Sequence, residues 1–158
     1  MQENNNTLLV NLKTTYSLNF ERLNITKTTY VDDFLYVEVS LDPDYPTCPC
    51  CGSTDTRIHD YYTRTINHGI FNNYKCYIKY RQRRYRCFCG KRFTEQNPFV
   101  EKYNKISKNT KKSIMIKAIK KMSFKDASDD LNISASTFVR IFNQHCKQHR
   151  RVLPRVLS

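Results

Sequence analysis

The spacing of hydrophobic and polar residues divides the chain into a β-rich part followed by a helical part. Residues 25–30 are rich in threonine, and residues 34–41 alternate as Phe-Leu-Tyr-Val-Glu-Val-Ser-Leu, with the turn signal Asp32-Asp33 between them. This pattern predicts a β-hairpin. Residues 56–68 and 74–87 predict two further strands.

The strand predicted over residues 74–87 has two chemically different faces. Because side chains alternate along a strand, one face carries Tyr74, Cys76, Ile78 and Tyr80. The opposite face carries Lys75, Tyr77, Lys79, Arg81 and Arg83. We therefore expect one face to pack in a core and the other to form a basic stripe.

The residues that follow Phe99 predict helices, because glycine is absent beyond Gly90 and apolar residues recur at helical spacing. Thr110 is the predicted cap of a first helix with the apolar positions Ile114, Met115, Ala118, Ile119 and Met122. Ser123 and Asp126 fit a capping box, which predicts a short helix over residues 124–131 that ends at Asn132. Ser134 caps a third helix, whose apolar face carries Phe138, Ile141 and Phe142.

Net charge indicates a class of partner. The chain has 27 lysines and arginines against 14 acidic residues, a net charge of +13. Residues 1–47 have a net charge of −4, residues 48–112 of +11 and residues 113–158 of +6. A basic body that follows an acidic lead-in is typical of proteins that bind a polyanion. The alternative is a basic surface that only keeps the protein in solution.

Several classes of protein do not fit the sequence. With three glycines in 158 residues, there is no GxGxxG motif and no Walker loop. The N-terminus does not resemble a signal peptide, and no apolar run is long enough for a membrane span. We therefore expect neither a membrane protein nor a small-molecule substrate, and place the protein in the cytoplasm.

The cysteines form two clusters that predict a zinc ribbon. Cys48-Pro-Cys50-Cys51-Gly52 is one knuckle and Cys87-Phe-Cys89-Gly90 is the other. In a reducing compartment, clustered cysteines indicate a metal site before a disulfide, and zinc takes four thiolates tetrahedrally. The glycine after each knuckle lets the backbone turn beneath the metal. The predicted ligands of a structural Zn²⁺ are Cys48, Cys51, Cys87 and Cys89.

Some alternatives for the ligand set stay open at this stage. The second knuckle is CxC rather than CxxC, Cys50 is able to replace Cys48, and His59 is a less favoured substitute ligand. Cys76 and Cys146 lack partners at ligand spacing and are expected to be core or surface thiols. Four thiolates leave no open position for water, so the site is expected to be structural.

The second and third predicted helices have the pattern of a helix-turn-helix motif. Small residues, Ala127 and Ser128, stand where the two helices approach each other, and the third helix opens with Ser-x-x-Thr. Polar residues on the outer face of the third helix are able to reach phosphates or base edges. The alternative is an ordinary three-helix bundle with a polar face. The predicted DNA-contacting residues, with those of the ribbon, are Lys75, Lys79, Arg81, Arg83, Arg84, Arg86, Lys91, Arg92, Ser136, Thr137, Arg140, Asn143 and Gln144.

Four short stretches resemble a known family. Cys-Pro-x-Cys-Gly-Ser at residues 48–53 is followed by Ile-His-Asp-Tyr at 58–61 and by the arginine-rich run Arg-Arg-Tyr-Arg-Cys at 83–87. Cys-Gly-Lys-Arg-Phe-Thr-Glu follows at residues 89–95. This arrangement resembles the N-terminal region of bacterial insertion-sequence transposases of the ISL3 group. In that family a zinc ribbon and a helix-turn-helix precede a DDE catalytic domain.

The resemblance implies an α+β protein that binds the terminal inverted repeats of a transposon. Its expected parts are a lead-in with a β-hairpin (residues 1–44), a zinc ribbon (45–100) and a helix-turn-helix unit (101–150). Residues 151–158 resemble the approach to the first catalytic strand. No catalytic carboxylate is expected in this chain, which should therefore cut nothing. A homodimer on paired ends and association with the nucleoid are further expectations.

Three rival functions remain at this stage. A standalone transcriptional regulator would combine the same two modules. An RNA-binding ribbon protein would use some of the eleven tyrosines to stack on single-stranded bases. A metal-dependent nuclease would cut DNA in the presence of magnesium.

Overall fold

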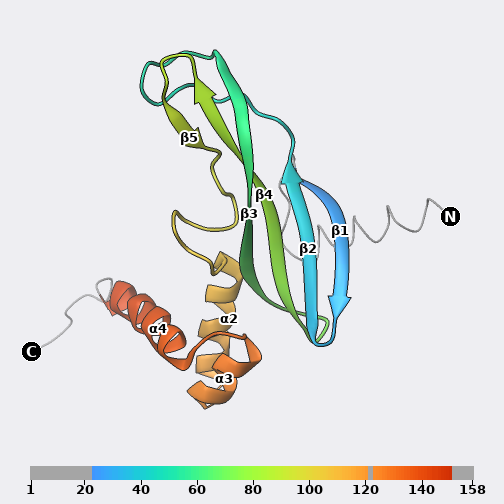
Figure 1. Cartoon of the computed structure of the whole chain (residues 1–158). Coiled ribbons are helices and arrows are strands. Elements are labelled where there is room, and N and C mark those ends of the chain that lie inside the picture. The colour runs from blue at the N-terminus through green and yellow to red at the C-terminus, as the bar shows by residue number, and fades with distance from the viewer. Residues whose placement is uncertain (1–22, 121–122, 151–158) are drawn as a thin grey trace, which may run out of the picture.

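The computed structural model describes residues 23–120 and 123–150, which form one sheet and a three-helix unit (Figure 1). Met122 was expected to be an apolar position of the first helix, and residues 151–158 the approach to a catalytic strand. Both lie outside the described residues. The elements are β1 (Leu23–Val31), β2 (Phe34–Leu41), β3 (Thr56–Phe71), β4 (Tyr74–Cys87), β5 (Arg92–Thr94), α2 (Lys108–Ile119), α3 (Phe124–Asp130) and α4 (Ala135–Arg150). The predicted α+β class is confirmed.

All five strands belong to one sheet with the order β1-β2-β4-β3, and β5 pairs with β4. The predicted hairpin forms between β1 and β2, with Asp32 in the left-handed backbone conformation that Asp tolerates at a turn (φ 50°). The hairpin joins the ribbon through a parallel pairing of β2 with β4. The hairpin and the ribbon are therefore parts of one continuous sheet.

The buried face of β4 changes along the strand. Towards its start, Cys76, Ile78 and Tyr80 lie in a core with β2, Phe99 and Val100, as the period-two pattern predicts. Towards its end, Arg83, Tyr85 and Cys87 are buried instead, and these residues lie on the opposite face. The basic stripe predicted on the odd-numbered face therefore ends before Arg83.

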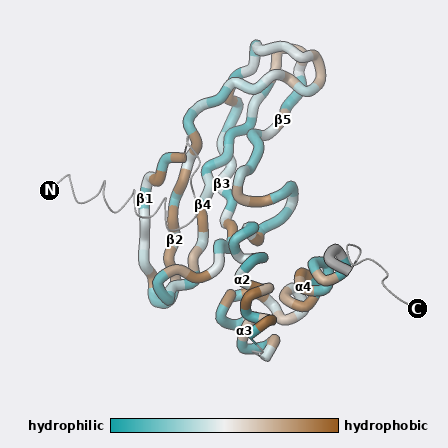
Figure 2. Tube along the Cα trace, turned by 180° about the vertical axis from the view of Figure 1, so that it is seen from behind, coloured by the Kyte–Doolittle hydropathy of each residue, from teal (hydrophilic) through white to brown (hydrophobic). Residues whose placement is uncertain are grey.

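The helices form a second core, which Figure 2 shows as apolar segments where α3 and α4 meet. Ile114, Ala127, Leu131, Phe138 and Ile141 are buried together. The small residues Ala127 and Ser128 are both buried, as expected at a close approach of two helices.

Two of the three predicted helix caps are confirmed, and one is wrong. Ser123 Oγ accepts from Lys125 N–H, and Ser134 Oγ accepts from Thr137 N–H at 3.2 Å. The first helix starts earlier than predicted, because its cap is Ser107, which accepts from the Thr110 amide. Thr110 lies inside the first turn, where its hydroxyl donates to Asn67 O at 2.9 Å.

Asn67 of β3 joins the sheet to the helices. Its side-chain Nδ2 donates to Leu131 O (2.7 Å), and its Oδ1 accepts from Thr110 Oγ1 (3.1 Å). Its backbone accepts from the Ser107 amide and donates to Lys105 O. A break in the β3–β4 register between Asn67 and Gly69 makes room for these contacts. The three-helix unit is thus fixed at one end of the long β3–β4 hairpin, and the cysteine knuckles lie at the other (Figure 1).

Candidate metal centre and nucleic-acid interface

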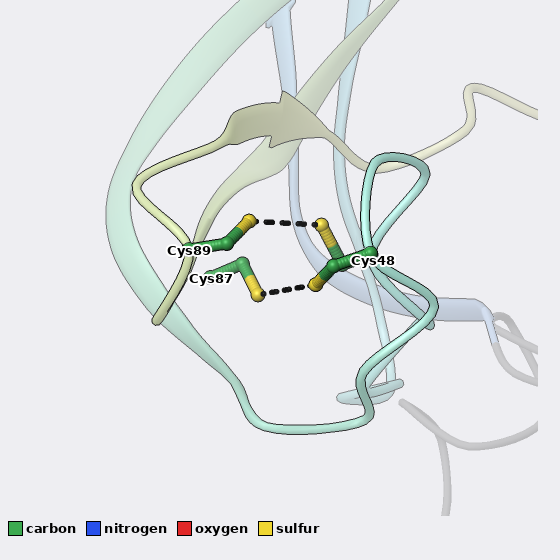
Figure 3. Close-up of side chains that lie close together, drawn as sticks. Cys48, Cys87 and Cys89 are labelled. Carbon is green, nitrogen blue, oxygen red and sulfur yellow. Dashed lines mark hydrogen bonds between the residues drawn. The ribbon is translucent and has the colours of Figure 1, made fainter.

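Four cysteine sulfurs meet at the far end of the β3–β4 hairpin. The Sγ atoms of Cys48, Cys51, Cys87 and Cys89 all lie within 4.8 Å of one another. Cys48 Sγ is 3.7 Å from Cys89 Sγ, and Cys51 Sγ is 3.5 Å from Cys87 Sγ (Figure 3). A tetrahedron with Zn–S bonds of about 2.3 Å has sulfurs about 3.8 Å apart, so this donor set fits zinc.

Tight turns bring each pair of sulfurs together. The Gly52 amide donates to Cys48 O (2.9 Å), and the Gly90 amide donates to Cys87 O (3.0 Å). Both glycines have positive φ, +70° and +85°. A Cβ at either position would meet nothing within 4 Å, so the dihedral angle, not a clash beneath the metal, is the reason for glycine here.

The pKa values of Cys48 and Cys87 are shifted in opposite directions. Burial would raise the pKa of Cys48, but hydrogen bonds from the backbone amides of Cys51 and Cys50 outweigh this and lower the pKa to about 6. A backbone hydrogen bond from Cys89 lowers the pKa of Cys87, but burial and the neighbouring thiols outweigh it and raise the pKa to about 12. Zinc must therefore displace protons when it binds at neutral pH.

The other candidate ligands lie apart from this cluster. Cys50 is exposed, and its amide points to Cys48 Sγ at 3.4 Å, so it supports the turn without joining the four sulfurs. His59 is exposed at a break in the pairing of β3 with β4. Cys76 is buried in the sheet core, and Cys146 is half-buried on α4.

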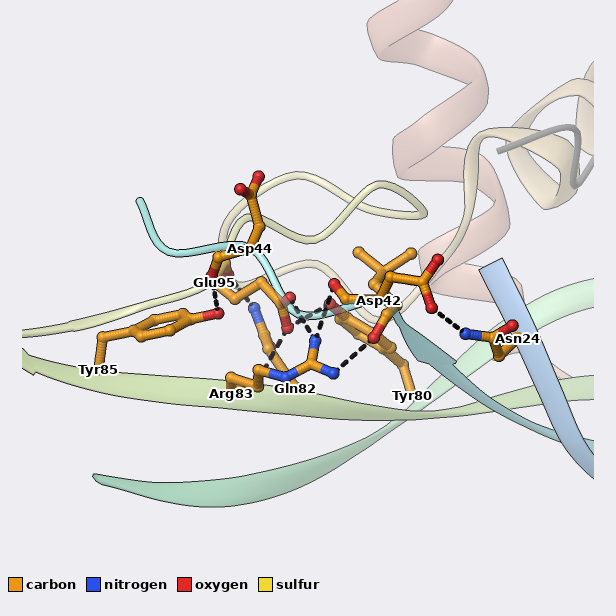
Figure 4. A network of polar contacts seen from close by, with 9 residues as sticks. Asn24, Asp42, Asp44, Tyr80, Gln82, Arg83, Tyr85 and Glu95 are labelled. Atoms are coloured by element: carbon orange, nitrogen blue, oxygen red, sulfur yellow. Dashed lines mark hydrogen bonds and ion pairs between the residues drawn. The ribbon is translucent and has the colours of Figure 1, made fainter. Parts of the chain in front are cut away.

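Arg83 is not a surface residue, so its predicted place on the exposed basic stripe is wrong. Its side chain is 8% exposed and forms an ion pair with Glu95 (Nη1–Oε1, 2.9 Å). It also donates to the carbonyl oxygens of Leu41 and Asp42 (Figure 4). Glu95 accepts from Tyr80 Oη at 2.7 Å, and burial is the main reason why the pKa of Tyr80 is strongly raised. This network fastens the segment before the first knuckle to the sheet.

The remaining cations of the predicted stripe lie against aromatic rings. Lys79 Nζ is 4.8 Å from the centre of the Tyr36 ring, and the Arg81 guanidinium is 3.9 Å from that of Tyr61. Lys75 lies 5.8 Å from the Phe34 ring. Such contacts hold long cationic side chains extended over the sheet surface.

Arg84 and Arg86 are exposed on the face of β4 opposite to Arg81. Arg84 pairs with Asp60 at 3.4 Å. Lys91 and Arg92 are exposed beside the second knuckle. The cations predicted to contact DNA thus form two groups, one on the open sheet face and one near the cysteines.

Helix α4 presents the predicted polar residues to solvent. Ser136, Arg140, Asn143 and Gln144 are exposed, and Thr137 is half-buried. Gln144 also lines a groove of about 440 Å³ between α2 and α4, together with Lys108, Lys111 and Lys112. These three lysines are not among the DNA-contacting residues predicted from the sequence, although their spacing of three and four residues places them on one face of a helix.

The start of α4 adjoins the open sheet face. Asn132, in the turn between α3 and α4, donates from its side chain to Tyr77 Oη on β4. Tyr77 stacks on Tyr36, the ring beneath Lys79. The basic sheet face and the first turn of α4 are therefore neighbouring parts of one surface.

Comparison with known proteins places two family domains on these two structural units. Residues 44–90 match the zinc-finger of transposase IS204/IS1001/IS1096/IS1165. Residues 95–146 match the helix-turn-helix domain of transposase family ISL3. No curated protein and no solved structure matches the chain.

These matches confirm the zinc ribbon, the helix-turn-helix and the structural Zn²⁺ expected from the sequence. The two domains are the DNA-binding domains of a transposase. None of the helices in residues 23–120 and 123–150 is long and apolar enough to cross a membrane.

Proposed function

The chain belongs to the ISL3 family of transposases through these two domains, and on that premise we propose that it recognises the terminal inverted repeats of its transposon. The observation that carries the proposal is the common surface formed by the start of α4 and the basic face of the sheet, joined where Asn132 contacts Tyr77. A helix that reads bases needs neighbouring cations to bind the phosphates on either side. This role places the protein on the bacterial nucleoid.

The proposed base-reading residues lie along one side of α4. Arg140 is suited to guanine, and Asn143 and Gln144 are suited to adenine, because their side chains match the hydrogen-bonding edges of those bases. Ser136 and Thr137, at the start of the helix, are suited to phosphate. Lys75, Lys79 and Arg81 would bind the backbone next to the groove that α4 enters.

Zinc has an architectural part in this proposal. Cys48, Cys51, Cys87 and Cys89 would hold the ion and thereby close the end of the sheet. When bound, the metal supplies folding free energy and no reaction chemistry, since four thiolates fill its coordination sphere.

The test is a competition experiment on the zinc-loaded chain. Its affinity for a duplex with the element's terminal repeat is compared with that for a shuffled duplex and for single-stranded RNA. We expect the terminal repeat to be preferred by at least about a thousandfold over the shuffled duplex. Preference for RNA would favour the stacking function, and equal binding to all duplexes would refute end recognition.

Two variants separate base reading from backbone binding. Arg140→Ala should weaken binding to the terminal repeat by about 1–3 kcal/mol and leave binding to the shuffled duplex nearly unchanged. Lys79→Gln should weaken both equally and reduce the slope of log affinity against log salt concentration by about 0.9. If Arg140→Ala lowered both affinities equally, α4 would not read bases.

A further inference from the structure

The turn between the second pair of cysteines holds a phenylalanine in solvent. The Phe88 side chain is 93% exposed, the largest exposed fraction among the large apolar residues of the described chain. It stands between Cys87 and Cys89, whose sulfurs both point into the metal cluster. Because its two neighbours are held in this way, the ring has little freedom to turn inward.

Three arginines form a row across the sheet beside this ring. Arg57 of β3 is the register partner of Arg86 of β4, and Arg86 is the partner of Arg92 of β5. Residues that are directly opposite each other on neighbouring strands share a face, and like charges in such positions are destabilising. All three side chains are exposed, and no carboxylate of the described residues forms an ion pair with any of them. This row therefore favours a polyanionic ligand.

The length of β4 sets the distance between this end of the sheet and α4. Tyr77 contacts the turn before α4, and Cys87 follows ten residues later on the same strand. At about 3.3 Å per residue, the separation is about 33 Å. The arginine row lies on the face of β4 opposite to Lys79 and Arg81, so it is a second basic surface, separate from the one beside α4.

We propose that Phe88 is a wedge that inserts between base pairs of duplex DNA at this end of the sheet, while Arg57, Arg86 and Arg92 bind the flanking phosphates. The inference rests on DNA binding as proposed above, and it adds a second contact that deforms the duplex. Apolar side chains in a basic setting are a known means of unstacking a base step. A protein partner fits less well, because four exposed cations, Arg57, Arg86, Lys91 and Arg92, lie at this end of the sheet.

The experiment compares Phe88→Ala, Phe88→Leu and the wild-type chain on duplexes in which 2-aminopurine replaces one base at successive positions. Its fluorescence rises when the base is unstacked. The wild type should show this rise at one position outside the segment that α4 contacts, and Phe88→Leu should keep part of it. Phe88→Ala should lose the rise and bind about tenfold more weakly.

Two control variants separate the wedge from general loss of aromatic or cationic surface. Tyr103→Asn removes another aromatic ring that is 84% exposed, and asparagine tolerates its positive φ of 67°. Lys27→Gln removes an exposed cation far along the sheet, on β1. Neither should alter the fluorescence. In contrast, Arg57→Gln, Arg86→Gln and Arg92→Gln together should reduce the salt slope by about 2.7.

The results also distinguish this inference from the proposed function. If the wild type prefers the terminal repeat but Phe88→Ala gives the same affinity and fluorescence, the wedge is refuted and end recognition stands. If the wild type unstacks a base through Phe88 but binds all duplexes equally, the wedge stands and end recognition is refuted. Loss of self-association in Phe88→Ala with unchanged DNA binding would show that the ring contacts a second copy, and would overturn the proposal.

Discussion

Replacing Asn67 with alanine should loosen the three-helix unit from the sheet. The side chain is buried and forms hydrogen bonds with two buried backbone groups, the carbonyl of Leu131 (2.7 Å) and the amide of Gly69 (3.1 Å). Leaving a buried polar group without its partner costs about 1–3 kcal/mol. With two such groups, the expected loss in the free energy of unfolding is about 2–6 kcal/mol, a large fraction of the stability of a small domain.

The assay is chemical denaturation of the zinc-loaded chain, followed by the helical circular dichroism signal. Asn109→Ala is the matched control, because Asn109 makes one hydrogen bond to the same segment, from Nδ2 to His68 O at 3.0 Å, and is only half-buried. It should cost about 1 kcal/mol or less. If Asn67→Ala were as mild as Asn109→Ala, the role of Asn67 in joining the two units would be refuted.

Three other predictions concern the metal site and the buried ion pair. Cys51→Ser should lose zinc and the folded ribbon, whereas Cys50→Ser should keep one zinc per chain by metal analysis; loss of zinc in both would show that Cys50 is a ligand. Zinc affinity, measured with a competing chelator, should fall from pH 8 to pH 6 by about tenfold per pH unit for each proton displaced, since protons then compete for the thiolates; a flat profile would contradict thiolate ligation. Glu95→Gln should lower the free energy of unfolding by about 3–5 kcal/mol, because Arg83 then stays buried without its carboxylate partner. Adding Arg83→Met should recover part of this loss. If the double variant recovers no stability, the unpaired charge of Arg83 is not the cause.

Local patterns were sufficient to predict most of the elements. Alternation over residues 34–41 and 74–87 gave strands β2 and β4, and both knuckles were evident from cysteine spacing followed by glycine. Strand β5 has only the three residues Arg92–Thr94, too few to show a period, and it is defined by its pairing with β4.

Contacts between distant residues account for the wrong predictions. Arg83 continues the alternation of Arg81, so its burial was not visible without knowing that Glu95 and the carbonyl of Leu41 return to that face. Thr110 has the chemistry of a helix cap, but its hydroxyl is engaged by Asn67, which lies 43 residues away in the sequence. In each case the side chain binds a residue that is distant from it in the sequence.

Nuclease footprinting of the zinc-loaded chain across the whole transposon tests the claim that the chain recognises the ends of its element. Recognition of the terminal repeats by α4 and the sheet predicts protection at both ends of the element, over more than one helical turn at each end. Protection confined to a promoter, or uniform weak protection along the element, would contradict that claim.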